Sequence, residues 1–424
     1  MRHLRNISLA LAALLATACH YDEEYWIDFT SASQASPEYF QVYGQRTSNL
    51  SEEGLPSDCH APDGTPIAEY KDTKATGANS TLFVQRLLDV GKGSKVTELA
   101  GTYTSVDTNG DPITLSGKVI LPSDGKFKRF IIVSHYTIGS NAEAPSNCFS
   151  LEGVLAPLGY CLIIPDYLGY GITAGLKHPY LAMDLTARNV LDMYMAVKPF
   201  LEACGVTPEF DDIFLMGYSQ GGANTMSLLR LIETQFTGGI KVRRAFAGGG
   251  PYDVTATYDQ FITTDHAAYP CAVPLVIQGM QVGAGLSLSL ETFTTPLVYE
   301  HLDEWFNSKK YSTRQMNAFL GTYKTSELVS AAGRDRTTFE VAELYMAMNQ
   351  NSIVKQHWTP AAPVYMFHSM DDDTVNFINA MHARSTWSDA NIIYNFGHYG
   401  DHTQAALRFI YTVKTMLVEE EVGL

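Results

Sequence analysis

Short apolar segments that alternate with amphipathic ones constrain the fold of this chain more than any other feature of its sequence. Residues 127–136, 159–171 and 212–219 are apolar runs with the length of a buried strand. Residues 180–201 and 222–236 instead carry apolar side chains at helical spacing. Buried strands that alternate with helices are typical of a parallel sheet covered on both faces. The sequence therefore predicts an α/β fold.

Two further patterns divide the chain into parts. Residues 97–122 alternate apolar and polar side chains around an Asn-Gly-Asp-Pro turn, which predicts an antiparallel hairpin. The strand pattern stops after residue 251, helical stretches follow, and strands resume near residue 361. We therefore predict a signal peptide over 1–18, an N-terminal extension over 19–95, a core in two parts over 96–251 and 361–424, and an inserted helical cap over 252–360.

The start of the chain is typical of an exported bacterial protein. Residues 1–6 are basic, residues 7–18 form an apolar run too short to span a bilayer comfortably, and Cys19 follows. We interpret "ATAC" as a lipobox, with Cys19 acylated as the first residue of the mature protein. The acidic residues 20–28 are similar to export tags of surface lipoproteins in Gram-negative bacteria. The prediction is an outer-membrane lipoprotein exposed at the cell surface; cleavage before an unmodified Cys19 is the alternative.

The charge balance narrows the classes of partner. The chain has 29 Lys and Arg against 45 Asp and Glu, a formal net charge of -16. An acidic chain without a basic patch argues against nucleic acid and against electrostatic docking on anionic lipid. Membrane association is therefore expected only through the N-terminal lipid anchor. The sequence carries no signal for the oligomeric state.

The cysteines do not form a metal-binding or disulfide framework. Apart from Cys19 there are five, an odd number with no CxxC spacing. One bridge is possible in an exported protein, and Cys59–Cys148 is the pair we favour. Cys161 lies in an apolar strand and is expected to be a buried free thiol. No metal and no cofactor are implied.

Ser219 is the first candidate for catalytic chemistry. Gly217-Tyr218-Ser219-Gln220-Gly221 is a G-x-S-x-G motif between an apolar strand and a helix. At such a turn the serine backbone is strained, the glycines leave room, and the hydroxyl projects above the sheet. The N–H of Gln220, at the helix N-terminus, is a candidate donor to an oxyanion. A plain glycine turn is the alternative for this motif.

A nucleophilic serine needs a histidine base and an acid that orients it, in the chain order serine, acid, histidine for this type of fold. Asp371, Asp372 and Asp373 all follow a later apolar strand. Asp372, with an apolar Val375 three residues on, fits the acid best. The other two are then solvated neighbours.

Two histidines precede the last helical segment. His402 stands directly at the start of that segment, and Gly400 allows the preceding loop to turn back toward the serine. We favour His402 as the base and keep His398 as the second candidate. His368 lies in the turn of the acid and is expected to be a packing residue.

The loop after the first buried core strand is expected to supply a second oxyanion donor. His135, Tyr136 and Thr137 bracket the N–H concerned, and Thr137 is our candidate. Asp166 precedes the nucleophile in the chain, so we interpret it as a residue that fixes a loop and not as the catalytic acid.

With these residues in place, the chain resembles the α/β-hydrolase superfamily, and within it the secretory lipase branch, the fungal lipase A type and its bacterial lipoprotein relatives. The resemblance rests on "GYCLIIPDYLGYG" followed by "HPYL", on "LMGYSQGG" and "GGGPYD", and on "APVYMFHSMDDDTV", and it spans roughly residues 100–417. It implies a mostly parallel eight-strand sheet with helices on both faces, a helical cap after the sixth strand, and ester hydrolysis through an acyl-enzyme. By motif it assigns Ser219, Asp372 and a histidine of "HYGDH". Many relatives have "HGT" where this chain has His135-Tyr136-Thr137, and a tyrosine there would narrow the acyl site or shift the oxyanion donor.

The resulting hypothesis is a serine carboxylic-ester hydrolase of the esterase or lipase kind, acting on small-molecule or polysaccharide-linked esters. One alternative is a serine peptidase of the prolyl or aminopeptidase type, which shares the fold and the triad. The sequence shows no leading β-propeller segment and no cluster for a substrate N-terminus. A second alternative is a surface binding lipoprotein on a catalytically dead hydrolase scaffold.

Overall fold

A nine-stranded sheet organises the molecule. The computed structural model describes residues 29–50, 55–69, 93–236, 239–388 and 390–422. The signal peptide and Cys19, predicted from the sequence, lie outside these residues. The strand order in the sheet is β1-β2-β3-β5-β4-β6-β7-β8-β9.

The strands follow the predicted alternation closely. They are β1 (Gln41–Leu50), β2 (Ser94–Val106), β3 (Pro112–Pro122), β4 (Arg129–Ser134), β5 (Tyr160–Pro165), β6 (Ile213–Tyr218), β7 (Val242–Gly248), β8 (Val364–Ser369) and β9 (Ile392–Gly397). The pairs that join β5, β4, β6, β7, β8 and β9 are parallel. The pairs β1–β2, β2–β3 and β3–β5 are antiparallel. The predicted hairpin is β2–β3, and the mostly parallel sheet is confirmed.

The predicted count of eight strands is one too low. Strand β1 comes from the segment assigned to the N-terminal extension and pairs with β2 at the edge of the sheet. Its sequence, QVYGQRTSNL, is largely polar, and only Val42, Ser48 and Leu50 are buried. An edge strand with so few buried positions has no apolar run by which it could be recognised.

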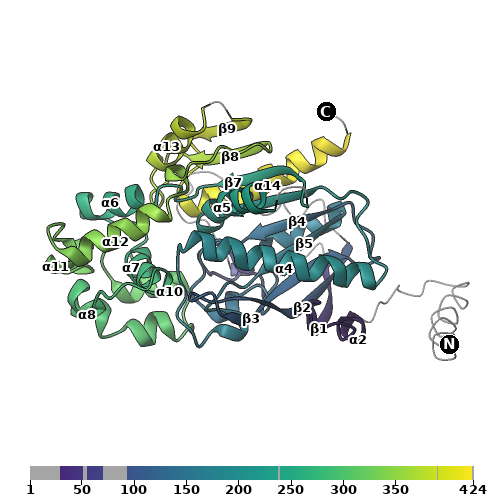
Figure 1. Cartoon of the computed structure of the whole chain (residues 1–424), viewed down its shortest axis with the longest axis horizontal. Helices are drawn as coiled ribbons and strands as arrows, with labels where there is room; N and C mark the ends of the chain where they lie inside the picture. Colours follow the sequence, from purple (N-terminus) through teal and green to yellow (C-terminus); the bar gives the residue numbers. More distant parts are fainter. Residues whose placement is uncertain (1–28, 51–54, 70–92, 237–238, 389, 423–424) are drawn as a thin grey trace, which may run out of the picture.

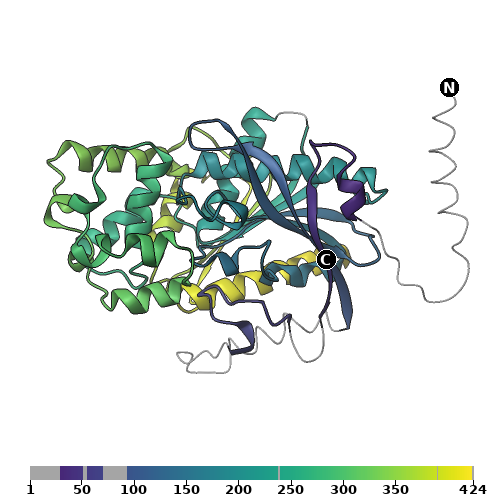
Figure 2. The ribbon, with the colours of Figure 1, turned by 90° about the horizontal axis from the view of Figure 1, so that it is seen from below.

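Helices cover both faces of the sheet (Figure 2). Helices α4 (Met183–Ala203) and α5 (Gln220–Gln235) lie on one face, and α14 (His402–Val422) lies on the other. Along β4, Phe130 and Ile132 pack in the core that includes α4 and α5. The alternate residues Ile131 and Val133 pack in the core that includes α14. This period of two is what a strand buried on both faces requires. Two short helices outside the insertion, α2 (Phe29–Ser33) and α13 (Ile378–Thr386), also contribute buried side chains to the core that includes α4 and α5.

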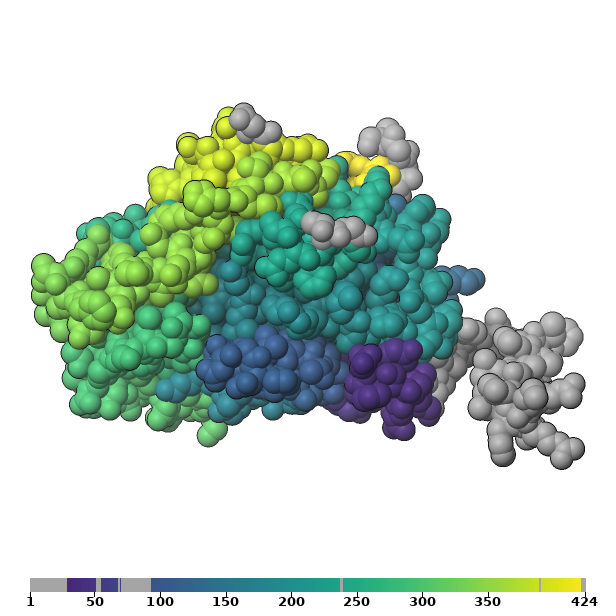
Figure 3. Space-filling model, in the orientation of Figure 1, coloured from purple at the N-terminus to yellow at the C-terminus, as the bar shows by residue number. Residues whose placement is uncertain are grey.

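The chain between β7 and β8 is largely helical and forms one end of the molecule (Figures 1 and 3). We call residues 252–360 the insertion. Its helices are α6 (Val254–Thr264), α7 (Ala272–Gly283), α8 (Leu290–Phe293), α9 (Pro296–Tyr299), α10 (Thr313–Leu320), α11 (Ala331–Arg334) and α12 (Phe339–Gln350), with a π-helical turn at Leu302–Asn307. None of the insertion's described residues adds a strand to the sheet. Within the described ranges, no helix combines the length and the apolar composition of a membrane span.

Candidate active site

Ser219 occupies a strained turn between β6 and α5. Its backbone has φ 58° and ψ −125°, outside the regions that a non-glycine residue ordinarily adopts. A Cβ on Gly221 would lie 1.9 Å from the carbonyl oxygen of Ser134, and a Cβ on Gly217 would lie 2.3 Å from the carbonyl oxygen of Gly221. Both flanking positions therefore require glycine, and the turn places the serine hydroxyl above the carboxyl edge of the sheet.

The structure brings Ser219, His402 and Asp372 into one hydrogen-bonded chain. The Nε2 atom of His402 lies 2.8 Å from the Ser219 hydroxyl oxygen. On the other side of the ring, Nδ1 lies 2.7 Å from the Oδ2 atom of Asp372. These three residues follow β6, β9 and β8, and parallel strands end at the same edge of a sheet. The sequence order serine, acid, histidine thus becomes a spatial row.

The turn after β8 fixes the carboxyl group of Asp372. Its Oδ1 atom accepts hydrogen bonds from the N–H groups of Thr374, at 3.0 Å, and Val375, at 2.8 Å. Burial alone would raise the pKa of Asp372, but His402, with smaller contributions from His368 and the N–H of Val375, outweighs burial and lowers it. Asp372 is therefore held as a carboxylate that faces the imidazole.

The electrostatic surroundings favour the protonated form of His402. Burial alone would lower the pKa of His402, but the Asp372 carboxylate, with smaller contributions from Asp373 and Asp401, outweighs burial and raises it. An imidazolium that forms on this ring during a reaction would be stabilised in place. The Tyr218 hydroxyl also donates a hydrogen bond of 2.9 Å to the backbone carbonyl of His402, which fixes the start of α14.

The other candidate residues are placed elsewhere. His398 is exposed, and its Nδ1 lies 2.8 Å from Asp371 on the surface. His368 is fully buried, its Nε2 donates to the carbonyl of Val375 at 2.9 Å, and burial lowers its pKa. Within the described ranges, neither His398 nor His368 has a hydrogen bond to the hydroxyl of Ser219.

Gln220 and Thr137 are the two residues whose backbone N–H groups the sequence predicts as oxyanion donors. Gln220 is the first residue of α5, so its N–H has no partner within the helix. Thr137 follows β4 and lines the same pocket as Ser219, and its hydroxyl lies 2.8 Å from that of Tyr180.

His178 is a supporting residue that sequence reasoning did not identify. Its Nδ1 donates to the carbonyl of Leu168 at 2.7 Å, and its Nε2 lies 3.0 Å from the side-chain nitrogen of Gln220. Burial lowers the pKa of His178 to about 3, so the ring is neutral and its Nε2 accepts from Gln220. The sequence contains His178 in "HPYL", but nothing there indicates that it contacts a residue 42 positions away.

Hydrogen bonds of buried residues fix the loop that carries Thr137. His135 is buried, its Nδ1 donates to the carbonyl of Tyr136 at 2.6 Å, and its own carbonyl accepts from the Tyr167 hydroxyl at 3.1 Å. Asp166 is fully buried and accepts hydrogen bonds from the hydroxyl of Ser116 and the N–H of Ser146. Asp166 thus ties the loop after β5 to strand β3 and to the loop that carries Ser146, and none of its hydrogen bonds in the described structure involves His402.

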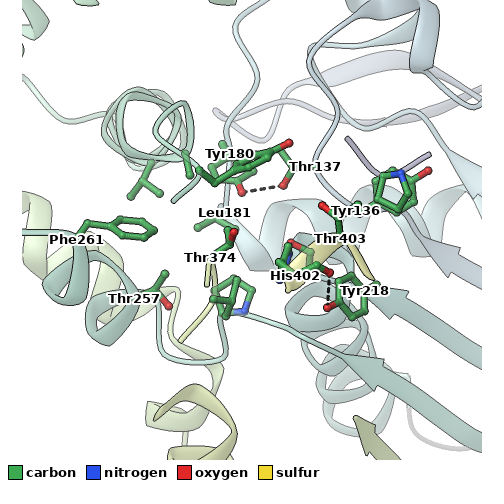
Figure 4. Close-up of a pocket in the computed structure, with 17 residues that line it drawn as sticks. Tyr136, Thr137, Tyr180, Leu181, Tyr218, Thr257, Phe261, Thr374, His402 and Thr403 are labelled. Atoms are coloured by element: carbon green, nitrogen blue, oxygen red, sulfur yellow. Dashed lines mark hydrogen bonds between the residues drawn. The ribbon is translucent and has the colours of Figure 1, made fainter. Parts of the chain in front are cut away.

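A pocket of about 610 Å³, counting the part that is open to solvent, is lined by Ser219 and His402. The insertion contributes Phe261 from α6 and Ala272 and Val276 from α7 to its wall. Figure 4 shows Phe261 on one side of His402 and Tyr136 on the other. Ser219 and His402, the predicted nucleophile and base, therefore lie in the wall of one pocket between the insertion and the loop after β4.

The disulfide between Cys59 and Cys148 is not present, and both residues are buried free thiols. Burial is the main reason that the pKa of each thiol is raised, which disfavours the thiolate needed for disulfide exchange. The Cys148 thiol instead donates to the backbone carbonyl of Glu143 at 3.3 Å. Cys161 is a buried free thiol, as expected from its position in β5.

Comparisons with known proteins agree with this architecture. The solved structure of the rice cell wall degrading esterase LipA from Xanthomonas oryzae superposes with a TM-score of 0.65 at 20% identity, over 80% of this chain and 93% of that chain. Candida antarctica lipase A superposes with a TM-score of 0.57 at 15% identity, over 91% of this chain and 83% of that chain. These likenesses show the α/β-hydrolase fold. No curated protein sequence matches significantly.

A family model assigns the chain more narrowly. The model of secretory lipases matches residues 145–408, more than half of the 424 residues, and this stretch contains Ser219, Asp372 and His402. The predicted α/β-hydrolase fold and secretory lipase branch are thereby confirmed. The chain belongs to the secretory lipase family, exported hydrolases of the esterase and lipase kind.

Proposed function

We propose that the protein is a serine carboxylic-ester hydrolase that works through a covalent acyl-enzyme. The observation that carries this proposal is the hydrogen-bonded row in which His402 lies 2.8 Å from the Ser219 hydroxyl and 2.7 Å from Asp372. This is the arrangement that makes a serine hydroxyl nucleophilic near neutral pH.

Acylation begins when the Ser219 oxygen attacks the ester carbonyl and its proton passes to Nε2 of His402. The tetrahedral intermediate then collapses, the bond to the alcohol oxygen breaks, and His402 returns the proton to the departing alkoxide. In the second half, His402 takes a proton from water, and the resulting hydroxide attacks the acyl carbon. The acid is released and Ser219 regains its proton. Asp372 stays ionised throughout and stabilises the imidazolium.

The oxyanion of both tetrahedral intermediates is assigned to the N–H groups of Gln220 and Thr137. Donors of this kind contribute roughly 3 kcal/mol each to transition-state stabilisation. The hydrogen bond from Gln220 to His178 and the contact between Thr137 and Tyr180 hold the two segments in position. No metal or cofactor takes part in the proposed reaction.

The proposed substrates are small-molecule or polysaccharide-linked esters, and nucleic acid is not a proposed partner. The structural neighbour from Xanthomonas oryzae is named a rice cell wall degrading esterase, which makes polymer-linked esters a class worth testing here. We further propose that acylated Cys19 anchors the mature enzyme in the outer membrane, with the catalytic domain exposed at the cell surface.

The test is hydrolysis of p-nitrophenyl esters, from acetate to palmitate, by a form without Cys19. Ser219→Ala and His402→Ala should each lower kcat by at least about a thousandfold. His398→Ala is the matched control, because it removes a neighbouring histidine that does not contact Ser219, and it should retain activity. Hydrolysis that survives Ser219→Ala would overturn the proposal. Turnover of peptide amides with none of the esters would favour the serine peptidase.

A further inference from the structure

Tyr136 separates two cavities. The first is the pocket that contains Ser219 and His402, and Tyr136 lines it together with Pro62 from the N-terminal segment. The second cavity is small: it measures about 340 Å³ when the part open to solvent is counted, has enclosed room for little more than one water molecule, and contains Tyr136 but neither Ser219 nor His402 in its wall. Tyr136 is the residue that lines both cavities within the described part of the chain.

The two ends of the active-site pocket differ in chemistry. The end formed by the insertion carries Phe261, Ala272 and Val276, and these side chains suit a hydrocarbon chain. Tyr136 lies on the other side of His402 from Phe261 (Figure 4). The second cavity, which Tyr136 also lines, has Glu143 and Glu152 in its wall beside apolar residues such as Phe149. An ester has an acyl part and an alcohol part, and the apolar end fits the acyl chain better. The alcohol part is then directed toward Tyr136.

The residues behind Tyr136 would receive a polar group. The carboxyl groups of Glu143 and Glu152 are both buried, and burial raises the pKa of each to about 7. His60 also lines this cavity, and its buried Nδ1 has no hydrogen-bond partner among the described atoms. The Oε2 atom of Glu143 already accepts from the N–H of Ser140 at 2.8 Å, which leaves the Glu152 carboxyl group and the His60 imidazole to bind an alcohol chain that bears ether or hydroxyl oxygens.

The side chain of Tyr136 contacts the N-terminal segment, which limits the movement of its ring. Its hydroxyl makes a long contact of 3.5 Å with the backbone carbonyl of His60. Residues 55–69, which carry His60 and Pro62, are in turn tied to the insertion by a hydrogen bond of 2.7 Å from Arg314 to Thr65. The ring therefore closes the pocket against a segment that is itself fixed.

We propose that Tyr136 is the residue that limits the size of the alcohol part of the ester, and that removing its ring opens the active site into the second cavity. This inference rests on the proposed ester hydrolysis. It identifies the preferred substrates as esters of small alcohols, and it identifies the space vacated by the ring, joined to the small second cavity, as a latent site for a larger, oxygen-rich alcohol.

The substitution Tyr136→Ala removes the ring without removing the contacts that hold the loop. The backbone carbonyl of Tyr136 still accepts from Nδ1 of His135, and Tyr167 and Tyr180 still bind the residues on either side. Tyr136→Phe is the matched control, because it keeps the ring and removes only the hydroxyl.

The experiment uses the full-length chain and measures acid release in a pH-stat. One series varies the alcohol at constant acyl group, methyl butyrate against the butyrate of tri(ethylene glycol), and another varies the acyl group from methyl acetate to methyl octanoate. The wild type should prefer methyl butyrate in kcat/KM by at least about tenfold. Tyr136→Ala should reduce that preference at least about tenfold, Tyr136→Phe should keep it within about twofold, and the acyl profile should not move.

The wild-type profile alone can overturn the proposal, whether or not the alanine variant folds. Equal kcat/KM values for the two butyrates would show that Tyr136 imposes no limit on the alcohol. A change in the acyl profile of Tyr136→Ala, with an unchanged alcohol preference, would place the ring on the acyl side instead. If the wild type hydrolyses no ester and Ser219 does not react with a fluorophosphonate, the proposed function itself fails.

Discussion

Replacing Asp372 by asparagine should reverse the hydrogen bond to His402, because the turn after β8 decides which side-chain atom faces the imidazole. Oδ1 of Asp372 accepts from the N–H groups of Thr374 and Val375, and Oδ2 faces Nδ1 of His402 at 2.7 Å. An asparagine keeps both backbone donors satisfied only when its carbonyl oxygen takes the place of Oδ1. Its NH₂ group then points at Nδ1 of His402.

The reversed hydrogen bond selects the wrong tautomer of the base. An NH₂ group can donate only to an unprotonated Nδ1, so the proton of the neutral ring moves to Nε2. A protonated Nε2 faces the Ser219 hydroxyl as a donor and cannot accept its proton. In serine hydrolases with this triad the same exchange lowers kcat by roughly 10⁴-fold. At 1.36 kcal/mol per tenfold, this is about 5 kcal/mol of lost transition-state stabilisation.

The assay is kcat for p-nitrophenyl butyrate, with thermal unfolding measured in parallel to establish that the variant is folded. Asp371→Asn is the matched control, because Asp371 is an exposed neighbour that pairs with His398, and it should cost less than about threefold. A folded Asp372→Asn enzyme within tenfold of the wild type would refute the tautomer argument. A loss of equal size in Asp371→Asn would refute the assignment of the acid.

Three further predictions concern pH and stability. Because a neutral His402 is the base and nearby carboxylates raise its pKa, kcat/KM should increase with pH through an apparent pKa above 6.5; Asp373→Asn should move this limb to lower pH, and an unmoved limb would contradict the electrostatic argument. Gly221→Ala would place a Cβ 1.9 Å from a backbone oxygen and should cost several kcal/mol of unfolding free energy, whereas Gly175→Ala, with open space around it, should cost less than about 0.5 kcal/mol in urea denaturation. Asp253 caps α6 and pairs with the far end of the insertion, so Asp253→Ala should cost roughly 2 kcal/mol near neutral pH. Since the pKa of Asp253 is lowered, the part of this stability that depends on its charge is fully present above pH 3.8 and decreases as the pH falls toward the folded-state pKa, so a stability difference between the two proteins that is as large at pH 2 as at pH 7 would count against the assignment.

The parts of the fold that the sequence predicted are those with local signals. The buried strands β4, β5 and β6 carry continuous apolar runs, and α4 carries a helical period, so each was recognisable on its own. Strand β1 was missed because its stability comes from pairing with β2 and not from its own apolar content. The predicted Cys59–Cys148 disulfide was wrong, because the spacing of cysteines in the sequence does not show which acceptor a buried thiol donates to.

The candidate site shows the same division between local and long-range information. Ser219 lies in a motif that the strand before it and the helix after it distinguish from a plain glycine turn. Asp372 differs from its two neighbours by its spacing to Val375. The structure brings both to His402. The contacts of Gln220 with His178 and the position of Tyr136 between two cavities depend on distant segments, and no local pattern indicates them.

The measurement that tests the central claim most directly is the mass of the protein after reaction with a fluorophosphonate, followed by mapping of the modified peptide. We expect a single adduct on Ser219 in the wild type and in His398→Ala, and a strongly reduced labelling rate in His402→Ala. An adduct on another residue, or equal labelling rates with and without His402, would contradict the assignment of Ser219 and His402 as nucleophile and base.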